Sequence, residues 1–248
     1  MCHPEQAFFA CEGSNVNEKI LHPQKIGNLL MKRESHLFAC HKFLEKNGSQ
    51  ILICLAKMNF KDLREIEIIY NQIEDYVTTL KNHAQWEEEF IFNKFFSKDE
   101  ILLFFGEHTD LDNKSKKIIE ELKAISNCDI QSRVFKVKQI YLDFKIFYAS
   151  NLTHFHNEET NFLSMLQERA TDDEIRAIDK PIYQHMSSNE IMEMLAGLFP
   201  PINLSEKKNI LNDLKNFNPV NFECALPEIR KMLTVAEVAE LGSDLTYE

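Results

Sequence analysis

The distribution of proline is the sequence feature that most constrains the fold of this chain. No proline occurs between residues 24 and 180, and the only glycines in that window are Gly27, Gly48 and Gly106. A β-protein of this size would need many glycine and proline turns, whereas long helices need their absence, so the window is predicted to be helical. The prolines of the 248-residue chain lie at positions 4, 23, 181, 200, 201, 219 and 227.

Apolar periodicity divides this window into four long helices. The first is expected to end at Asn47-Gly48, with a turn-like or short helical stretch after it, and Thr171 with Glu174 is expected to cap a further helix. Long helices joined by short connections favour antiparallel neighbours, so we predict an all-α, up-down-up-down four-helix bundle. The predicted spans are 26–46, 61–96, 100–125 and 130–169, with the intervening stretch at 49–60.

The predicted domain organisation has three parts: an N-terminal tail over 1–25, the bundle over 26–170 and a C-terminal helical extension over 171–248. After Pro181 we expect two or three shorter helices, broken at Pro200-Pro201 and at 216–219. Because the extension is too short for a large core, we expect it to pack on the bundle.

Charge and composition narrow the classes of partner. The net charge of −11 argues against nucleic acid, because phosphate binding needs a basic surface. No run of about 18 apolar residues is present, so no membrane span is expected. The N-terminus has no basic stretch followed by an apolar one, and the six cysteines form no C-x-x-C pair. We therefore expect reduced thiols and a cytoplasmic location.

Two segments of the chain share an H-x-x-x-E-E pattern followed by apolar residues. They are NHAQWEEEFIF at 82–92 and THFHNEETNFL at 153–163. Residues four apart project from the same helix face one turn apart, so His83 with Glu87, and His154 with Glu158, point at common places. An imidazole beside a carboxylate suits iron, manganese or zinc.

The spacing of two further histidines extends this pattern. His36 precedes His83 by 47 residues, and His108 precedes His154 by 46, so similar connections would put all four at one level of a bundle. His41 also begins an H-x-x-x-E pattern. It lies about 140° round the helix from His36, so only one of the two can face the site, and the spacing favours His36.

This arrangement resembles the hemerythrin-like (HHE cation-binding) family over residues 30 to about 168, with Glu107-His108 opening the third helix. The segment at 182–214 is similar to the C-terminal extension of some members. The resemblance implies a bundle around a non-haem di-iron centre, with manganese or zinc as alternatives. Asp112 stands where oxygen-carrying members have a fifth histidine, so reversible oxygen carriage is not expected. The implied ligands are His36, His83, His108 and His154, with Glu87 and Glu158 as bridging carboxylates.

The leading functional expectation is a di-iron protein that senses or handles O₂, iron, or reactive oxygen or nitrogen species. Small ligands would be O₂, NO or peroxide. One alternative is an oxidoreductase or a repair enzyme for damaged iron centres. Another is an interaction protein with a structural metal, whose extension binds a protein partner. Glu88, Glu89 and Glu159 are expected to be solvated or to orient an imidazole N–H.

Overall fold

The computed structural model describes residues 37–125 and 127–245. Within these ranges the chain is helical and contains no β-strand, which confirms the all-α prediction for this part of the molecule. No helix in these ranges is both long enough and apolar enough to cross a lipid bilayer. The predicted tail over 1–25 and the first residues of the predicted bundle lie outside the described residues.

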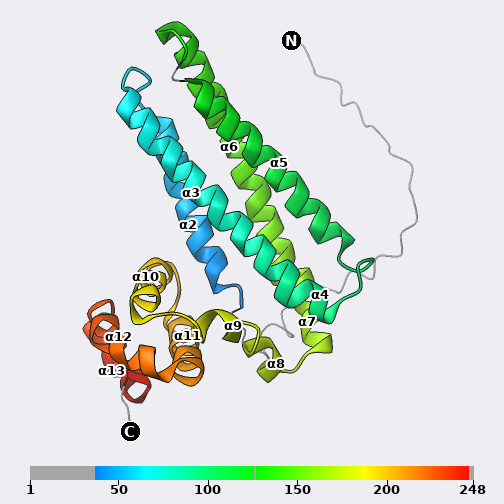
Figure 1. Ribbon diagram of the computed structural model, residues 1–248, viewed down its shortest axis with the longest axis vertical. Helices are drawn as coiled ribbons and strands as arrows, with labels where there is room; N and C mark the ends of the chain where they lie inside the picture. The colour runs from blue at the N-terminus through cyan, green and yellow to red at the C-terminus, as the bar shows by residue number, and fades with distance from the viewer. Residues whose placement is uncertain (1–36, 126, 246–248) are drawn as a thin grey trace, which may run out of the picture.

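Four long helices lie side by side and give the molecule its length (Figure 1). Helices α2 and α5 each pack against both α3 and α6. The connections are short, as predicted, and the side chains of Asp62 and Asp129 cap α3 and α6 by accepting backbone N–H bonds from the first turn. The four helices are α2 (Ala39–Lys57), α3 (Leu63–Glu87), α5 (Leu102–Ile125) and α6 (Ile130–Asn157).

The first long helix continues through Gly48, so the predicted helix end at Asn47-Gly48 and the separate stretch over 49–60 are wrong. Tertiary packing explains the glycine. A Cβ atom at Gly48 would lie 2.5 Å from the ring of Tyr148 and 2.7 Å from the hydroxyl of Tyr76. The glycine therefore allows α2 to approach two tyrosine side chains closely, and it does not end the helix.

Buried residues recur at alternating spacings of three and four along the long helices, which keeps one face of each turned inward. On α2 this stripe consists of His41, Leu44, Gly48, Ile51 and Leu55. On α6 it includes Phe144, Phe147, Asn151 and His154. Near one end of the long helices, histidines therefore occupy positions that apolar residues fill elsewhere.

Helices α3 and α6 are each followed by a π-helical turn and then by another stretch of α-helix. The turns cover Glu88–Phe92, before α4 (Asn93–Phe95), and Glu158–Phe162, before α7 (Leu163–Arg169). The backbone N–H of Asn93 bonds to the carbonyl of Glu88, and that of Leu163 to the carbonyl of Glu158, five residues back in both cases. Such turns occur frequently at functional sites. Here both fall within the repeated H-x-x-x-E-E segments.

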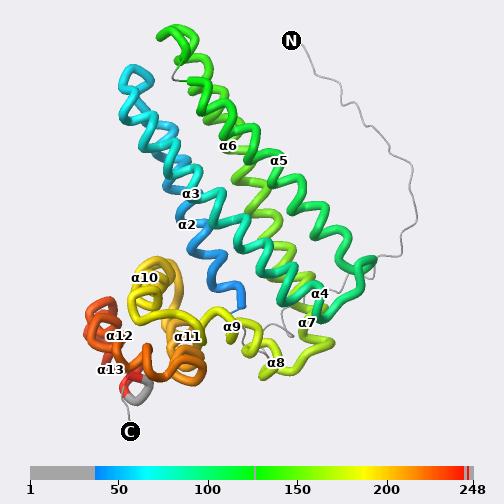
Figure 2. Tube along the Cα trace, in the orientation of Figure 1, coloured from blue at the N-terminus to red at the C-terminus, as the bar shows by residue number. Residues whose placement is uncertain are grey.

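Short helices gather at one end of the long ones (Figures 1 and 2). The predicted breaks are confirmed, because α10 ends before Pro200 and α11 ends before Pro219. The capping pair Thr171 and Glu174 is confirmed as well. The helices after residue 181 outnumber the predicted two or three, since Pro219 opens a helix instead of only ending one. The short helices are α8 (Asp172–Arg176), α9 (Lys180–Tyr183), α10 (Ser188–Leu198), α11 (Leu204–Phe217), α12 (Pro219–Lys231) and α13 (Val235–Leu241).

These C-terminal helices bury an apolar core of their own, which includes Ile191, Leu195 and Leu211. Ala39, in the first turn of α2, belongs to the same cluster, and α10 packs on α2. An ion pair of 2.5 Å between Lys42 of α2 and Glu206 of α11 joins the two parts. The C-terminal helices are thus attached to the end of α2 that carries His41.

Candidate metal centre

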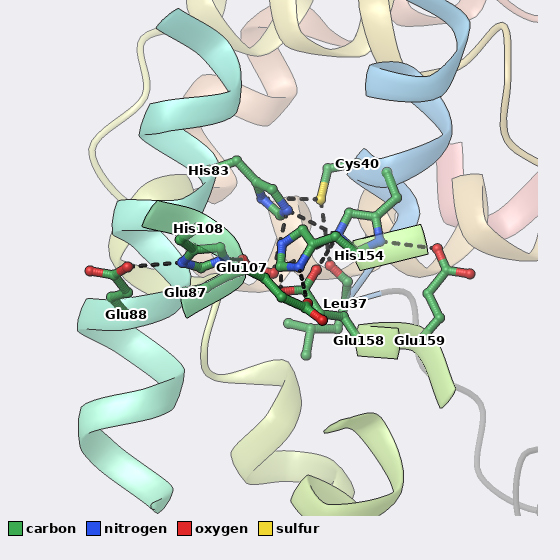
Figure 3. A network of polar contacts seen from close by, with 11 residues as sticks. Leu37, Cys40, His83, Glu87, Glu88, Glu107, His108, His154, Glu158 and Glu159 are labelled. Atoms are coloured by element: carbon green, nitrogen blue, oxygen red, sulfur yellow. Dashed lines mark hydrogen bonds and ion pairs between the residues drawn. The ribbon is translucent and has the colours of Figure 1, made fainter. Parts of the chain in front are cut away.

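Six side chains meet in the interior, five from the four long helices and one, Glu158, from the π-helical turn that follows α6 (Figure 3). Their donor atoms form two groups of four, and within each group all atoms lie within 4.8 Å of one another. Both groups contain the two carboxylates. One group is His41, His83, Glu87 and Glu158, and the other is Glu87, His108, His154 and Glu158.

Each carboxylate faces both pairs of imidazoles, using a different oxygen for each pair. In Glu87, Oε1 lies 3.3 Å from Nε2 of His83, and Oε2 lies 3.5 Å from Nε2 of His108. In Glu158, Oε1 lies 3.1 Å from Nε2 of His154, and Oε2 lies 3.4 Å from Nε2 of His41. This is the arrangement of two carboxylates that bridge two adjacent binding positions.

The two carboxylates are buried at high cost. Glu87 and Glu158 are 0% exposed, and none of their four oxygens accepts a hydrogen bond of good geometry from the part of the chain that the structure describes. A buried carboxylate is costly unless it is paired or coordinates a metal. In addition, Nε2 of His41 and Nε2 of His83 are only 2.9 Å apart. These donor atoms are therefore arranged to surround positive charge.

Outside this cluster, each imidazole has a partner on its other nitrogen. Glu159 lies 3.0 Å from Nδ1 of His41, and Glu88 lies 2.8 Å from Nδ1 of His108. Glu107 lies 2.8 Å from Nδ1 of His154. A carboxylate that accepts the Nδ1–H bond leaves Nε2 as the inward donor atom and makes the ring more basic.

The fourth imidazole, His83, has a sulfur partner instead. Sγ of Cys40 lies 3.8 Å from its Nδ1, at the start of α2. Burial raises the pKa of this thiol well above its ordinary value, with a further contribution from the charge of Glu87. Cys40, Cys54, Cys128 and Cys224 are free thiols, of which Cys224 is exposed; Cys2 and Cys11 lie outside the described residues.

The pKa values of the histidines show how this cluster distributes protons. Burial lowers the pKa of His83 to about 4 and also lowers that of His154. Burial acts in the same direction on His41 and His108, but contacts with the surrounding carboxylates outweigh it. The pKa of His41 therefore rises to about 9, and that of His108 rises to about 10.

The two central carboxylates are pushed in opposite directions. Burial and the charge of Glu87 raise the pKa of Glu158 to about 8. Burial also disfavours ionisation of Glu87, but the neighbouring histidines more than compensate and lower its pKa well below the ordinary value. At neutral pH, protonated His41 and His108 thus supply positive charge, and a proton on Glu158 removes one negative charge from the cluster.

Aromatic rings hold the imidazoles in place. His41 is stacked between Phe38 and Phe155, with centroid distances of 4.8 and 4.3 Å. His108 stacks on Phe92 at 5.7 Å. These stacking contacts restrict rotation of the imidazoles.

Five of the six predicted ligands, namely His83, Glu87, His108, His154 and Glu158, lie together in this cluster. The sixth, His36, lies outside the described residues. The histidine that α2 contributes is His41, which the spacing argument passed over. The sequence feature that indicates His41 is the spacing of the buried residues of α2, which continues without a break from His41 through Gly48 to Leu55. A predicted helix end at Gly48 interrupts this spacing, so the prediction misses His41.

The sequence predicts only some of the side chains that contact the outer nitrogens of the imidazoles. Glu88 and Glu159 orient imidazoles, as one of the two expectations had it, while Glu89 is exposed. Sequence reasoning gave no such role to Glu107 or Cys40, because both act across helices. Asp112 lies apart from the cluster, in ion pairs with Lys81 at 2.9 Å and Lys116 at 2.5 Å.

Two cavities reach the cluster from different sides. One, of about 320 Å³, lies between α3, α5 and α6 and is bounded by His83, His108 and His154. The other, of about 360 Å³, lies between α2 and α3 on one side and α9 and α10 on the other, and is bounded by Cys40 and His83. His83 therefore borders both cavities.

Fold and site together define an all-helical protein with a buried histidine–glutamate cluster that could hold metal ions. In comparisons with known proteins, residues 14–130 match the model of a family described as protein of unknown function, DUF2972. This match covers less than half of the chain and ends before His154 and Glu158. No curated protein and no solved structure matches the chain.

The predicted membership of the hemerythrin-like family is wrong. The family model that matches belongs to an uncharacterised family, and nothing in the comparisons shows a hemerythrin-like domain. Residues four apart share a face in any helix, so an H-x-x-x-E-E pattern brings an imidazole and a carboxylate together whatever family the chain belongs to. The pattern therefore indicates which side chains meet, but it does not identify a family.

Proposed function

We propose that this protein binds two transition-metal ions, one beside His41 and His83 and the other beside His108 and His154. Glu87 and Glu158 bridge the two ions. One observation carries this proposal: each of these carboxylates faces both imidazole pairs with separate oxygens, and all four oxygens are buried without a hydrogen-bond partner in the described chain. A single ion would leave half of these oxygens unused.

The donor set is compatible with iron, which we take as the metal. Imidazole nitrogen with carboxylate oxygen suits iron, manganese and zinc, whereas softer metals prefer sulfur. Two imidazoles and two shared carboxylates are few ligands for each ion, so a small molecule has room to bind. A non-haem di-iron centre supplies electron exchange with O₂, NO or peroxide at such positions.

The protein accordingly senses or handles O₂, iron, or reactive oxygen or nitrogen species. We take the long helices as an up-down-up-down bundle that carries all ligands at one level. Glu88, Glu107 and Glu159 hold the imidazole tautomers, and the stacking contacts restrict rotation of the imidazoles. Loss of the ions would leave the buried carboxylates compensated only by protons on the cluster and would loosen the packing of the ligand-bearing helices. That coupling between metal and packing is what a sensor requires.

Metal analysis of protein purified without oxygen tests this proposal. We expect about two iron ions per chain, and a visible spectrum that changes reversibly when O₂ is added. Glu87→Ala and Glu158→Ala should each remove most of the bound iron. The matched control is Glu89→Ala, in the same Glu-Glu-Glu run but exposed, and it should retain the iron. A chain without metal, or with one zinc ion, would overturn the proposal.

An oxidoreductase is the second candidate, favoured by the cavity between α3, α5 and α6. Its volume of about 320 Å³ is at the lower end of the range for small-molecule sites, and three histidines of the centre border it. Steady consumption of peroxide or NO by the iron-loaded protein would favour this candidate. A reversible spectral change without turnover would favour the sensor.

A further inference from the structure

The four imidazoles of the centre differ in the partners that hold them from outside. Glu159, Glu88 and Glu107 are within 3.0 Å of Nδ1 of their respective histidines. Among the residues that the structure describes, no carboxylate lies on Nδ1 of His83, and Sγ of Cys40, at 3.8 Å, takes the corresponding position. Figure 3 shows this sulfur beside His83, on the outer side of the cluster.

A thiol can orient His83 without adding charge. Sγ of Cys40 also lies 3.8 Å from the carbonyl oxygen of Leu37, which can accept the S–H bond. The sulfur is then free to accept the Nδ1–H bond of His83, which leaves Nε2 as the inward donor atom. The tautomer is the same as for the other three rings, but a neutral thiol does not raise the basicity of the ring as a carboxylate does.

This difference makes the two halves of the centre unequal. The pair His108 and His154 is supported by two carboxylates, Glu88 and Glu107. The pair His41 and His83 is supported by one carboxylate, Glu159, and one thiol. The first half therefore has one more negative charge directly behind its imidazoles, and opposite charge nearby favours a bound cation.

From this we infer that Cys40 is the positioning residue of His83 and makes the half formed by His41 and His83 the weaker of two metal positions. The ions then load in order, with the half formed by His108 and His154 filling first. This inference rests on the proposed two-metal function. It adds an order of binding and names the residue that sets it.

Titration of metal-free, full-length protein with Co²⁺ tests the order, because the visible absorption of Co²⁺ reports each ion as it binds. The wild-type protein should show two separate binding steps. Cys40→Ala should weaken the second step by about 10–100-fold and leave the first unchanged, the range found when the outer partner of a metal-binding histidine is removed. Cys40→Asp should strengthen the second step and narrow the gap between the two.

Two further variants keep this test decisive if the buried aspartate prevents folding. Cys40→Ser keeps a group that both donates and accepts, so it should restore the second step relative to Cys40→Ala. Cys54→Ala removes a thiol from the same helix about 21 Å away and should change neither step. Equal weakening of both steps by Cys40→Ala, or no weakening at all, would overturn the inference.

The outcomes also separate this inference from the proposed function. A wild-type chain that binds no Co²⁺ contradicts the two-metal centre, and the inference is rejected with it. A wild-type chain that binds two ions with affinities insensitive to Cys40 keeps the two-metal centre and rejects only the inference.

Discussion

Nε2 of His41 on α2 lies 2.9 Å from Nε2 of His83 on α3. Both rings also have a partner on Nδ1, so neither can turn away without breaking a second contact. Two nitrogen lone pairs at this distance repel each other unless a proton or a cation lies between them. The contact places His41 inside the candidate centre, together with His83 and His154 of the two H-x-x-x-E-E segments.

Replacement of His41 tests that position. We expect His41→Ala to reduce the bound metal from about two ions to about one per chain, because the half it shares with His83 loses one of its two imidazoles. Metal content after dialysis against weak chelator measures the loss. His36→Ala is the comparison variant, and a loss of metal in that variant with none in His41→Ala would favour His36 as the ligand in place of His41.

Replacement of Glu107 tests the support of His154. Glu107→Gln keeps the shape of the side chain but removes the negative charge that holds Nδ1–H at 2.8 Å. We expect metal affinity to fall by about 10–100-fold with the helical content unchanged. Chelator competition gives the affinity, and circular dichroism gives the helical content. Glu89→Gln serves as control, and an equal fall in both variants would contradict a specific role for Glu107.

Proton release on metal binding tests the electrostatics of the centre. Without metal, His41 and His108 have pKa values of about 9 and 10, above the ordinary value, so both are protonated at pH 7. Their favourable contacts with carboxylates are complete below about pH 6.5 and are lost as the pH rises through 9 to 10. Metal must displace these protons, so affinity should increase with pH.

A weakly buffered titration at pH 7 measures this release directly. Addition of metal should acidify the solution, and the proton on Glu158, whose pKa is about 8, should contribute as well. Metal binding without a change in pH would show that these groups are already deprotonated at neutral pH.

Replacement by alanine should change the free energy of unfolding in opposite directions at two glycines of the long helices. At Gly48 the new methyl group meets the ring of Tyr148 and the hydroxyl of Tyr76, so we expect a loss of about 1–3 kcal/mol in the free energy of unfolding. At Gly106 of α5 no described atom beyond the helix's own nearby backbone lies within 4 Å of the new Cβ, and alanine should stabilise by up to about 1 kcal/mol. Urea denaturation of both variants provides the comparison; stabilisation by Gly48→Ala would contradict the close approach of the helices.

Local sequence patterns are sufficient to predict the long helices. They are also sufficient to predict which side chains of the two H-x-x-x-E-E segments face inward. The lack of proline from 24 to 180 predicts long helices. Helix α5 follows its expected span closely, and the other two expected spans are matched only when α3 and α6 are taken together with the π-helical turn and short helix that follow each. The four-residue interval between His83 and Glu87 predicts a shared face, and both side chains lie in the cluster. These predictions succeed because they depend on helix geometry alone.

The remaining features depend on contacts between helices, which no local period encodes. Gly48 has the sequence signature of a helix end, but two tyrosines from other helices determine its role. Glu107 supports a histidine 47 residues away, and Cys40 supports one 43 residues away. The π-helical turns were not predicted, because the surrounding apolar pattern fits an uninterrupted α-helix equally well.

Those π-helical turns at 88–92 and 158–162 have a consequence for how the helices pack beyond the cluster. A π turn amounts to a single-residue insertion into an α-helix, so deleting one residue restores a regular helix whose flanking parts keep their packing. In both segments the insertion falls where neighbouring glutamates diverge, one toward the interior and the next toward an imidazole from outside. The turns thus let the helix beyond each turn keep its packing while the two neighbouring glutamates face different imidazoles.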